Sequence, residues 1–184
     1  MILQLDFTLL NWIQDHLRCA FLDFLMPLVT LYAEKGILLI GIGLCLLLFR
    51  SRRVCGAAVL TGLAGGLVIG NLFLKNWIAR PRPCWINTDV SMLTAVPTDY
   101  SFPSGHTLHS FIVAAVLLHY DRRLGIPALI MAALVAFSRL YLYVHYPTDV
   151  LAGMLLGIGI GTLAAVLVDG GAKSRDLQSK QAVI

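Results

Sequence analysis

The sequence predicts an all-α integral membrane protein, a bundle of about six transmembrane helices preceded by a helix at the membrane interface. Of the 184 residues, 58% are hydrophobic and only 13% are charged, and the mean hydropathy is +0.81. A soluble domain carries about 25% charged residues, so this composition favours lipid as the surrounding solvent. The apolar stretches are continuous instead of alternating, which is typical of membrane helices and excludes a β-barrel.

Four stretches have the length and the continuous apolar character of spanning helices. A bilayer core of ~30 Å takes ~20 apolar residues per helix. The four stretches are 54–74, 104–120, 124–143 and 148–168. We see no linker between them, so we expect one transmembrane domain over residues 1–184. Its polar motifs fall in a core at 50–168, and a polar tail follows at 169–184.

Three further segments make up the N-terminal part. Residues 36–49 are short for a span but uninterrupted. Residues 20–33 contain Asp23 and Pro27, so the sequence leaves open whether this segment crosses the membrane. Residues 1–18 mix apolar with charged side chains, which predicts an amphipathic helix lying at the interface. A disordered terminus is the alternative for these first residues.

Two of the apolar stretches carry glycine at a spacing that favours close helix packing. The glycines recur every four residues, at 62, 66 and 70 and again at 153, 157 and 161. Small residues on one helical face let two backbones approach in lipid. We therefore expect these two helices to pack on each other and to bring Lys75 and Asp149 together at one end.

The distribution of cations predicts the orientation in the membrane. Eight cations fall on one side if the helices alternate, namely Arg50, Arg52, Arg53, Arg122, Arg123, Lys173, Arg175 and Lys180. The positive-inside rule makes this side, with the tail, cytoplasmic. Four others fall on the opposite side, where the rule disfavours them: Lys75, Arg80, Arg82 and Arg139. We therefore expect a multi-pass protein of the cell membrane whose functional site faces the extracytoplasmic side.

The first polar cluster, KNWIARPRP, follows the 54–74 stretch. Pro81 and Pro83 fix the backbone on both sides of Arg82. A guanidinium held in this way can bind two oxygens of a phosphate at once, and Lys75 adds a point charge. Arg80 is expected to touch lipid headgroups at the interface and to stay outside the site.

The second cluster, PSGH, opens the 104–120 stretch. A helix N-terminus offers free N–H groups and partial positive charge to an anion. Gly105 allows close approach of the backbone, and the Ser104 hydroxyl can donate one more hydrogen bond. His106 lies in the first turn beside any bound anion, although a buried core histidine is the alternative. His109 is expected to be a buried polar residue without a chemical role.

The third cluster, SRLYLYVHYPTD, joins the last two stretches. It supplies Arg139 as a further cation, and His145 in a short turn. Asp149 follows four residues later, and a carboxylate that accepts from Nδ1–H leaves Nε2 of the imidazole free to act as nucleophile or base. Ser138 either binds the anion or bonds its own helix, and we favour the structural role.

Together the three clusters fit phosphoryl transfer without a metal, because they hold cations, two histidines and one orienting carboxylate but no carboxylate cluster for Mg²⁺. Their order and spacing, Lys-x6-Arg-Pro, PSGH and Ser-Arg-x5-His-x3-Asp, resemble the type-2 phosphatidic acid phosphatases, a superfamily shared with vanadium haloperoxidases and glucose-6-phosphatase. The resemblance implies that His145 attacks phosphorus and forms a phosphohistidine, that Asp149 orients it, and that His106 protonates the leaving oxygen. It also implies that no cofactor is needed and that the phosphate is held by Lys75, Arg82, Ser104, Gly105 and Arg139.

We therefore expect a membrane lipid phosphatase, a hydrolase of a phosphoric ester or diphosphate, whose substrate keeps its tail in the bilayer. Undecaprenyl diphosphate is the first expectation, because a compact protein with an outward site suits recycling of a cell-wall carrier. Phosphatidic acid or phosphatidylglycerol phosphate is the alternative, and Trp85 is best placed to line an access path for the tail. An anion channel is the alternative from another class. No nucleic-acid partner is expected, and the oligomeric state stays open.

Overall fold

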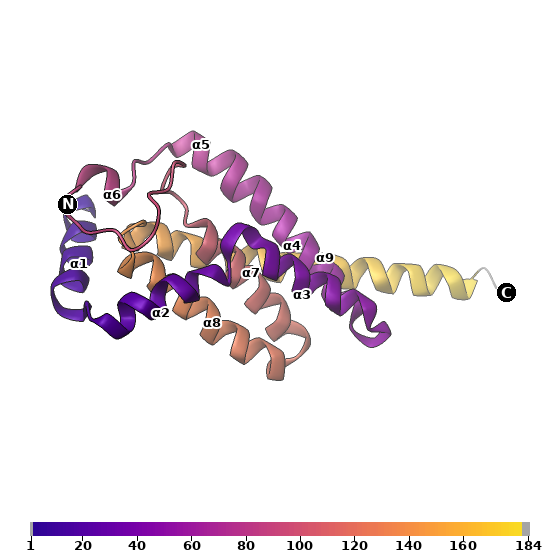
Figure 1. Cartoon of the computed structure of the whole chain (residues 1–184). Helices are drawn as coiled ribbons and strands as arrows, with labels where there is room; N and C mark the ends of the chain where they lie inside the picture. The colour runs from indigo at the N-terminus through magenta and orange to yellow at the C-terminus, as the bar shows by residue number, and fades with distance from the viewer. Residues whose placement is uncertain (1, 182–184) are drawn as a thin grey trace.

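The computed structural model describes the backbone of residues 2–181 and the side chains of residues 3–34 and 36–172. Over that range every regular element is a helix (Figure 1), which confirms the all-α prediction. In chain order the elements are α1 (Ile2–Leu17), α2 (Ala20–Leu31), η1 (Glu34–Gly36), α3 (Ile37–Leu48), η2 (Arg50–Arg52), α4 (Arg53–Gly66), η3 (Leu67–Leu74), α5 (Lys75–Ile78), α6 (Pro83–Ile86), α7 (Gly105–Tyr120), α8 (Arg122–Tyr141) and α9 (Pro147–Gln181).

Helix α7 forms the centre of the bundle. It packs against α4, α8 and α9, and Leu108, Ile112, Val113 and Val116 along it are fully buried. Because neighbouring helices surround it, α7 offers little apolar surface to lipid. Its first turn therefore lies in the middle of the bundle end that carries the polar clusters.

Among the described residues, three segments are long and apolar enough to cross a membrane by length and composition: Arg50–Ile86, Arg122–Tyr141 and Pro147–Ala172. The first runs from α4 through η3, a stretch of π-helix, into α5. Such wide turns are often found at functional sites, and here η3 leads directly to Lys75. The side chains of Lys173, Arg175 and Lys180, predicted to be cytoplasmic, lie outside the described residues.

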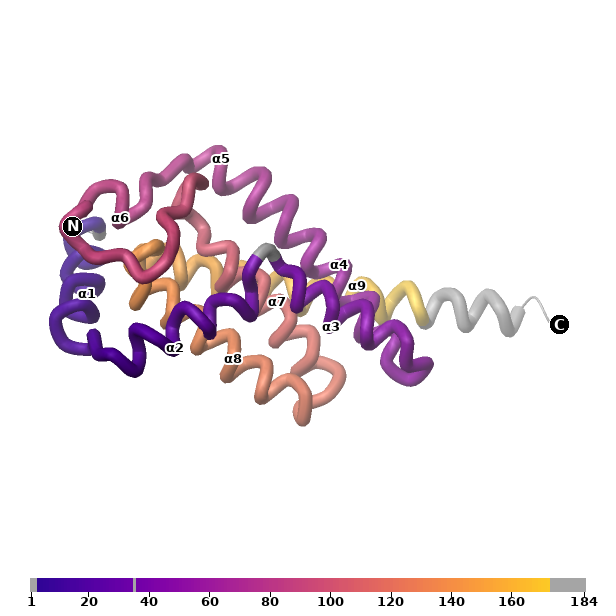
Figure 2. The backbone as a smooth tube through the Cα atoms, viewed as in Figure 1, coloured from indigo at the N-terminus to yellow at the C-terminus, as the bar shows by residue number. Residues whose placement is uncertain are grey.

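Helices α2 and α3 are each too short to cross a bilayer alone. Each has 12 residues, or about 18 Å at 1.5 Å per residue, against a core of ~30 Å. Helix α2 packs on α8 and α3 packs on α4, and Figure 2 shows the two following one another in the same general direction. This arrangement favours one crossing shared by the pair, whereas the predicted total of about six counts residues 20–33 and 36–49 separately. The number of crossings stays a prediction.

Both glycine stripes pack against α7. A methyl group built on Gly70 would lie 2.2 Å from Leu108 Cδ2, and one on Gly157 would lie 2.6 Å from the backbone oxygen of Leu108. Helices α4 and α9 do contact each other, as the spacing predicts, but their closest neighbours belong to α7. The small residues therefore let α4 and α9 approach the central helix from two sides.

Helix α1 crosses the end of the bundle at which α8 ends and α9 begins (Figure 1). One side of α1 is buried and includes Asp6, Leu10 and Ile13. The side chains of Leu9 and Trp12 are exposed, as expected for a helix at an interface. The irregular segment 87–104 joins α6 to α7 at the same end, so α1 and this segment frame the polar end of the bundle.

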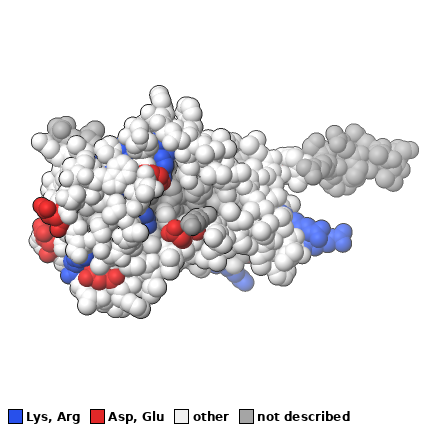
Figure 3. Space-filling model, turned by 45° about the horizontal axis from the view of Figure 1, so that its top comes forward, with Lys and Arg blue, Asp and Glu red and all other residues white. Residues whose placement is uncertain are grey.

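Figure 3 shows charged side chains over the half of the molecule near α1 and in the middle of the face, and a group of Lys and Arg side chains near the opposite end; most of the remaining surface is uncharged. At the end remote from α1, the turn between α3 and α4 carries Arg50, Arg52 and Arg53. Arg52 donates to Asp121 at the start of α8 over 2.7 Å. Two helical connections are thus tied together at the end opposite the polar clusters.

The packing of α9 on α7 can be tested with two glycines that lie two residues apart. We expect Gly157→Ala to destabilise the protein by about 1–3 kcal/mol, because the new methyl group would collide with backbone that cannot move freely. A methyl group on Gly159 would meet no described atom within 4 Å. Gly159→Ala should therefore be neutral, or stabilise by up to about 1 kcal/mol through helix propensity. Thermal unfolding in detergent measures both, and equal midpoints for the two variants would contradict the packing.

Candidate active site

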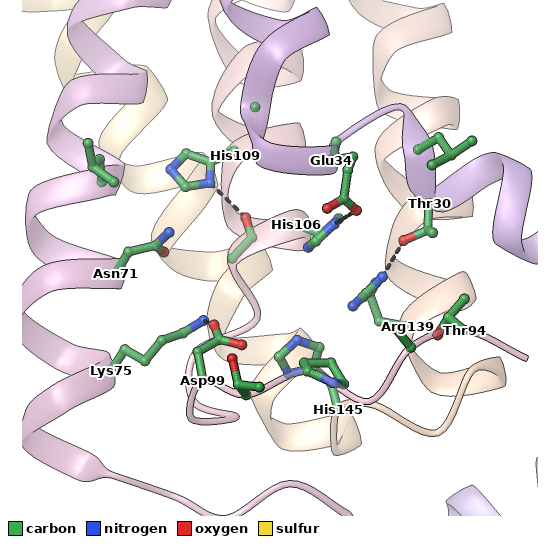
Figure 4. A pocket seen from close by; sticks show the side chains of 18 of the residues that line it. Thr30, Glu34, Asn71, Lys75, Thr94, Asp99, His106, His109, Arg139 and His145 are labelled. Atoms are coloured by element: carbon green, nitrogen blue, oxygen red, sulfur yellow. Dashed lines mark hydrogen bonds and ion pairs between the residues drawn. The ribbon is translucent and has the colours of Figure 1, made fainter. Parts of the chain in front are cut away.

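A cavity of about 1100 Å³ opens beside the first turn of α7. Six of the eight predicted site residues line it, as Figure 4 shows in part, namely Lys75, Arg82, Gly105, His106, Arg139 and His145. The other two, Ser104 and Asp149, are fully buried and lie behind the wall. The fold therefore brings the three sequence clusters into one place.

His145 is held on both ring nitrogens. An Arg82 N–H lies 3.1 Å from Nε2, and because a guanidinium can only donate, Nε2 must carry the lone pair. Nδ1 then carries the proton, with Ser101 Oγ at 3.3 Å and Asp149 Oδ2 at 3.6 Å. The arrangement assigns a neutral imidazole whose unprotonated nitrogen is directed toward Arg82 and the cavity.

Asp149 is surrounded by donors. Its Oδ2 accepts from the Ser101 hydroxyl at 2.5 Å and from the backbone N–H of Tyr146 at 3.0 Å. Its Oδ1 accepts from Arg80 at 2.6 Å. These bonds fix the plane of a carboxylate that has no exposure to solvent, and they satisfy its charge.

Arg82 and Lys75 share one carboxylate beside the cavity. Asp99 Oδ1 accepts from Arg82 at 2.7 Å, and the backbone oxygen of Asp99 accepts from Arg82 Nε at 2.7 Å. Asp99 Oδ2 accepts from Lys75. Lys75 and Arg82 are 8% and 2% exposed, so Asp99 pairs with two cations that have little contact with water.

Arg139 contributes a third cation from the end of α8. Its guanidinium donates to Thr30 of α2 and is 6% exposed. Within the part of the chain that the structure describes, Arg139 Nε is buried without a hydrogen-bond partner. A buried donor beside a cavity is suited to an anionic oxygen, because leaving it unpaired is costly.

The first turn of α7 places His106 on the wall, where its Nε2 lies 3.4 Å from Glu34 Oε2 of η1 (Figure 4). His109 also lines the cavity, but its Nδ1 lies 2.8 Å from the backbone oxygen of Gly105 and must donate to it. His109 is thus tied to its own helix. His106 is left as the histidine that faces His145 across the cavity.

Burial and nearby charges set the protonation states of His145 and Asp99. Burial, followed by the charges of Arg82 and Arg139, lowers the pKa of His145 well below its ordinary value of 6.5. Burial alone would raise the pKa of Asp99, but the hydrogen bond from Lys75 and the charge of Arg82 outweigh it and lower the pKa to about 2. At neutral pH the site therefore contains an unprotonated imidazole and an ionised Asp99.

The structure corrects the sequence-based interpretation of Arg80. Arg80 was expected to touch lipid headgroups, but it donates to Asp149 at 2.6 Å and to Asp6 at 2.7 Å. Its guanidinium carbon also lies 3.8 Å from the centre of the Tyr146 ring. The sequence alone cannot distinguish the role of Arg80 from that of Arg82, because Asp149 and Asp6, the partners of Arg80, lie 69 and 74 residues away along the chain.

One other expectation differs from the structure and one agrees with it. The Ser104 hydroxyl is 2.9 Å from Thr107 Oγ1 and is fully buried, so it does not reach the cavity. The indole N–H of Trp85 donates to the backbone oxygen of Pro97, a residue of the cavity wall, at 3.0 Å, and its place on an access path for a lipid tail stays a prediction. Ser138 bonds the backbone of Val135 at 2.7 Å, which is the structural role that we favoured.

Comparison with known proteins places this arrangement in a family. Residues 53–171 match the PAP2 superfamily, and this range contains all three motif clusters. The chain belongs to the PAP2 superfamily. It is therefore a phosphatase of the membrane, and the resemblance expected from the motifs is confirmed.

Individual relatives agree with this assignment. An undecaprenyl-diphosphatase of Sulfolobus acidocaldarius is 35% identical over 159 residues, which cover 86% of this chain and 74% of that protein. The crystal structure of Aquifex aeolicus LpxE matches with a TM-score of 0.76 at 29% identity, over 87% of this chain and 94% of that one. A transmembrane PAP2 type phosphatidylglycerolphosphate phosphatase of Bacillus subtilis matches with a TM-score of 0.66 at 29% identity, over 85% and 79% of the two chains.

Three polar residues of this PAP2 phosphatase site were missed by sequence reasoning: Ser101, Asp99 and Glu34. Ser101 and Asp99 come directly before PSGH, and their proximity to that motif is the one signal that could have marked them. Glu34 lies in a short turn between two apolar segments, where a single acid carries no pattern. No three His, Cys, Asp or Glu side chains gather into a metal-binding group among the described residues.

The role of Asp99 can be tested with a small anion. We expect Asp99→Asn to bind inorganic phosphate about tenfold more tightly, equivalent to about 1.4 kcal/mol, because it frees Lys75 and Arg82 from a competing carboxylate. Since the pKa of Asp99 is about 2, the difference from the natural protein should stay constant between pH 5 and 8. Calorimetric titration measures it, with Asp89→Asn as control because Asp89 is exposed in the same segment. Weaker phosphate binding in Asp99→Asn would show that Asp99 positions the cations instead of competing with the anion.

Proposed function

We propose that this protein is a metal-independent lipid phosphatase that hydrolyses a lipid phosphate or diphosphate through a phosphohistidine on His145. The observation that carries the proposal is the position of a neutral His145 on the wall of a cavity with three cations. An Arg82 N–H lies 3.1 Å from its Nε2, so a phosphoryl group that engages Arg82 also meets the nucleophile. The match of the site motifs to the family supports the same role.

In the first step, Nε2 of His145 forms a bond to phosphorus while the bond from phosphorus to the leaving oxygen breaks. His106 gives a proton to that oxygen. The imidazole becomes cationic, and its Nδ1–H remains directed at Ser101 and Asp149. In the second step, water attacks phosphorus, His106 takes up a proton from the water, and the bond to Nε2 breaks. Dividing the displacement in this way replaces one difficult step with two easier ones.

Positioning and charge supply most of the catalysis in phosphoryl transfer. Lys75, Arg82 and Arg139 line the cavity, and the first turn of α7 adds N–H groups at Gly105 and His106. The buried donor of Arg139 gains a partner when an oxygen binds. These groups stabilise the charge on the phosphoryl oxygens without requiring a divalent ion.

The other wall of the cavity supports a lipid substrate. It is apolar and comes from α2, α3, α4 and the start of η3, with Pro27, Leu28, Leu31, Ile40, Leu60, Leu63, Ala64 and Leu67. A long hydrocarbon tail could lie there while its phosphate reaches the cations. Undecaprenyl diphosphate is the substrate that we propose first, since an undecaprenyl-diphosphatase is 35% identical to this chain. Phosphatidylglycerol phosphate is the second candidate, because a structural relative is a phosphatidylglycerolphosphate phosphatase.

We place the site on the extracytoplasmic side of the cell membrane. Arg50, Arg52 and Arg53 lie in the turn between α3 and α4, and Arg122 and Arg123 lie at the start of α8. Both connections are at the bundle end remote from the cavity. The positive-inside rule assigns such an end to the cytoplasm, which leaves the cavity facing outward.

The catalytic proposal is tested by phosphate release from a panel of lipids in detergent. The panel contains undecaprenyl diphosphate, undecaprenyl phosphate, phosphatidic acid and phosphatidylglycerol phosphate. His145→Ala should lose activity by on the order of 10³-fold or more, while thermal unfolding shows that the variant is still folded. His119→Ala is the control, since His119 lies at the other end of α7 and should keep full activity. Activity should persist in excess EDTA, and turnover by His145→Ala would rule out the proposed nucleophile.

The orientation is tested by cysteine labelling in intact cells. Cys19 and Cys45 are exposed, so both are first replaced by serine. In this background Val90→Cys should react with a membrane-impermeant maleimide added outside, because residue 90 lies in the segment beside the cavity. Arg122→Cys should react only after the cells are opened. The opposite pattern would place the cavity on the cytoplasmic side.

A further inference from the structure

Two arginines of one sequence motif point to different partners. Arg82 lines the cavity, whereas Arg80 lies behind the wall and bridges two buried carboxylates. One terminal nitrogen of Arg80 donates to Asp149 Oδ1 at 2.6 Å and to Thr148 Oγ1 at 2.7 Å, and the other donates to Asp6 Oδ2 at 2.7 Å. The planar guanidinium thus joins the catalytic carboxylate to helix α1.

Asp6 is only 2% exposed. Such burial is unusual for an aspartate on a helix that is expected to lie at the membrane interface. Both of its oxygens accept hydrogen bonds. Oδ1 accepts from the backbone N–H of Thr148 at 3.1 Å, and Oδ2 accepts from the Thr148 hydroxyl at 2.7 Å and from Arg80. Burying a carboxylate is costly unless it is paired, so these contacts explain why an aspartate occupies this position. They also fix the first turn of α9, which carries Asp149.

The backbone of Arg80 holds a second member of the site. Its carbonyl oxygen accepts from the N–H of Ser101 at 2.9 Å, and the Ser101 hydroxyl in turn donates to Asp149 Oδ2. Arg80 therefore holds both oxygens of Asp149: its guanidinium binds Oδ1 directly, and its backbone holds Oδ2 through Ser101. With both oxygens held, the carboxylate cannot rotate away from Nδ1 of His145.

We propose that Asp6 and Arg80 form a positioning relay, in which they hold Asp149 and Asp149 in turn holds His145. Helix α1, which carries Asp6, therefore contributes to the active site. The inference rests on the proposed role of His145 as nucleophile. Arg80 between two carboxylates leaves a single net negative charge in this group. That charge faces the imidazole as it becomes cationic during phosphoryl transfer.

The relay makes a prediction that separates Arg80 from Arg82. Arg80→Gln should lower kcat by about 10²-fold, the scale of a misplaced reacting group, while KM and the affinity for inorganic phosphate stay within about twofold. Arg82→Gln should weaken phosphate binding as well as turnover. Arg80→Lys, which keeps a charge that can reach one carboxylate, should recover part of kcat. Phosphate release from the active lipid of the panel measures these values, with thermal unfolding as a check on folding.

Vanadate binding provides a readout that does not depend on turnover. Vanadate accepts a fifth ligand, here Nε2 of His145, whereas inorganic phosphate at equilibrium does not. Calorimetry should show Arg80→Gln binding vanadate about tenfold more weakly and binding phosphate normally. Asp6→Asn should also weaken vanadate binding, by a smaller factor, and leave phosphate binding unchanged. The new amide turns an N–H toward groups that already donate to Asp6. Asp15→Asn on the exposed side of α1 is the matched control and should change neither affinity.

The outcomes separate the relay from the function on which it rests. If the natural protein binds neither anion and releases no phosphate, the proposed function fails and the relay fails with it. If the natural protein is active and Arg80→Gln retains kcat and vanadate affinity, the relay alone is wrong. Loss of phosphate affinity in Arg80→Gln equal to that in Arg82→Gln would also overturn it, because Arg80 would then belong to the anion site.

Discussion

The hydrogen bonds to the carboxylate of Asp149 are the constraint on which the polar end of this molecule depends. A fully buried carboxylate requires donors, and here they come from segments far apart in the chain: Arg80 after α5, Ser101 before α7 and the Tyr146 N–H before α9. The N–H of Ser104 adds a bond to the Asp149 backbone oxygen at 3.2 Å. Satisfying this one charge therefore brings together the ends of three helices, and the cavity lies where they meet.

The apolar part of the bundle determines where those ends can lie. Because glycines on α4 and α9 allow both helices to contact α7 closely, the first turn of α7 reaches the level of Lys75 and Asp149. A side chain on Gly157 would meet the backbone oxygen of Leu108 at 2.6 Å, so the spacing has little tolerance. Hydrogen bonds of 2.5–3.0 Å at the polar end require such a fixed frame, since a shift of the helices would break several of them together.

Much of the site could be predicted from the sequence because its residues stand in motifs of fixed spacing. Lys75, Arg82, His106 and Arg139 each lie near the end of an apolar stretch, and alternation of the helices puts these ends on one side. Arg80 could not be assigned in this way, because its role depends on Asp6, 74 residues earlier. The packing of α2 and α3 was equally inaccessible, since their contacts with α8 and α4 are tertiary. Ser104 shows the converse, as a residue of the motif whose hydroxyl bonds Thr107 behind the wall.

The distribution of carboxylates shows how two of the three cations of the cavity are paired within the protein. Lys75 and Arg82 are almost fully buried, and removing charges from water costs several kcal/mol per ion unless they are paired. Asp99 pairs with both, and Glu34 lies beside His106 at 3.4 Å. Both acids are about half exposed, whereas Lys75 and Arg82 are almost fully buried. Returning a half-exposed acid to water costs less than leaving a buried cation unpaired. A phosphate that binds Lys75 and Arg82 can therefore take the place of Asp99 while both cations stay paired.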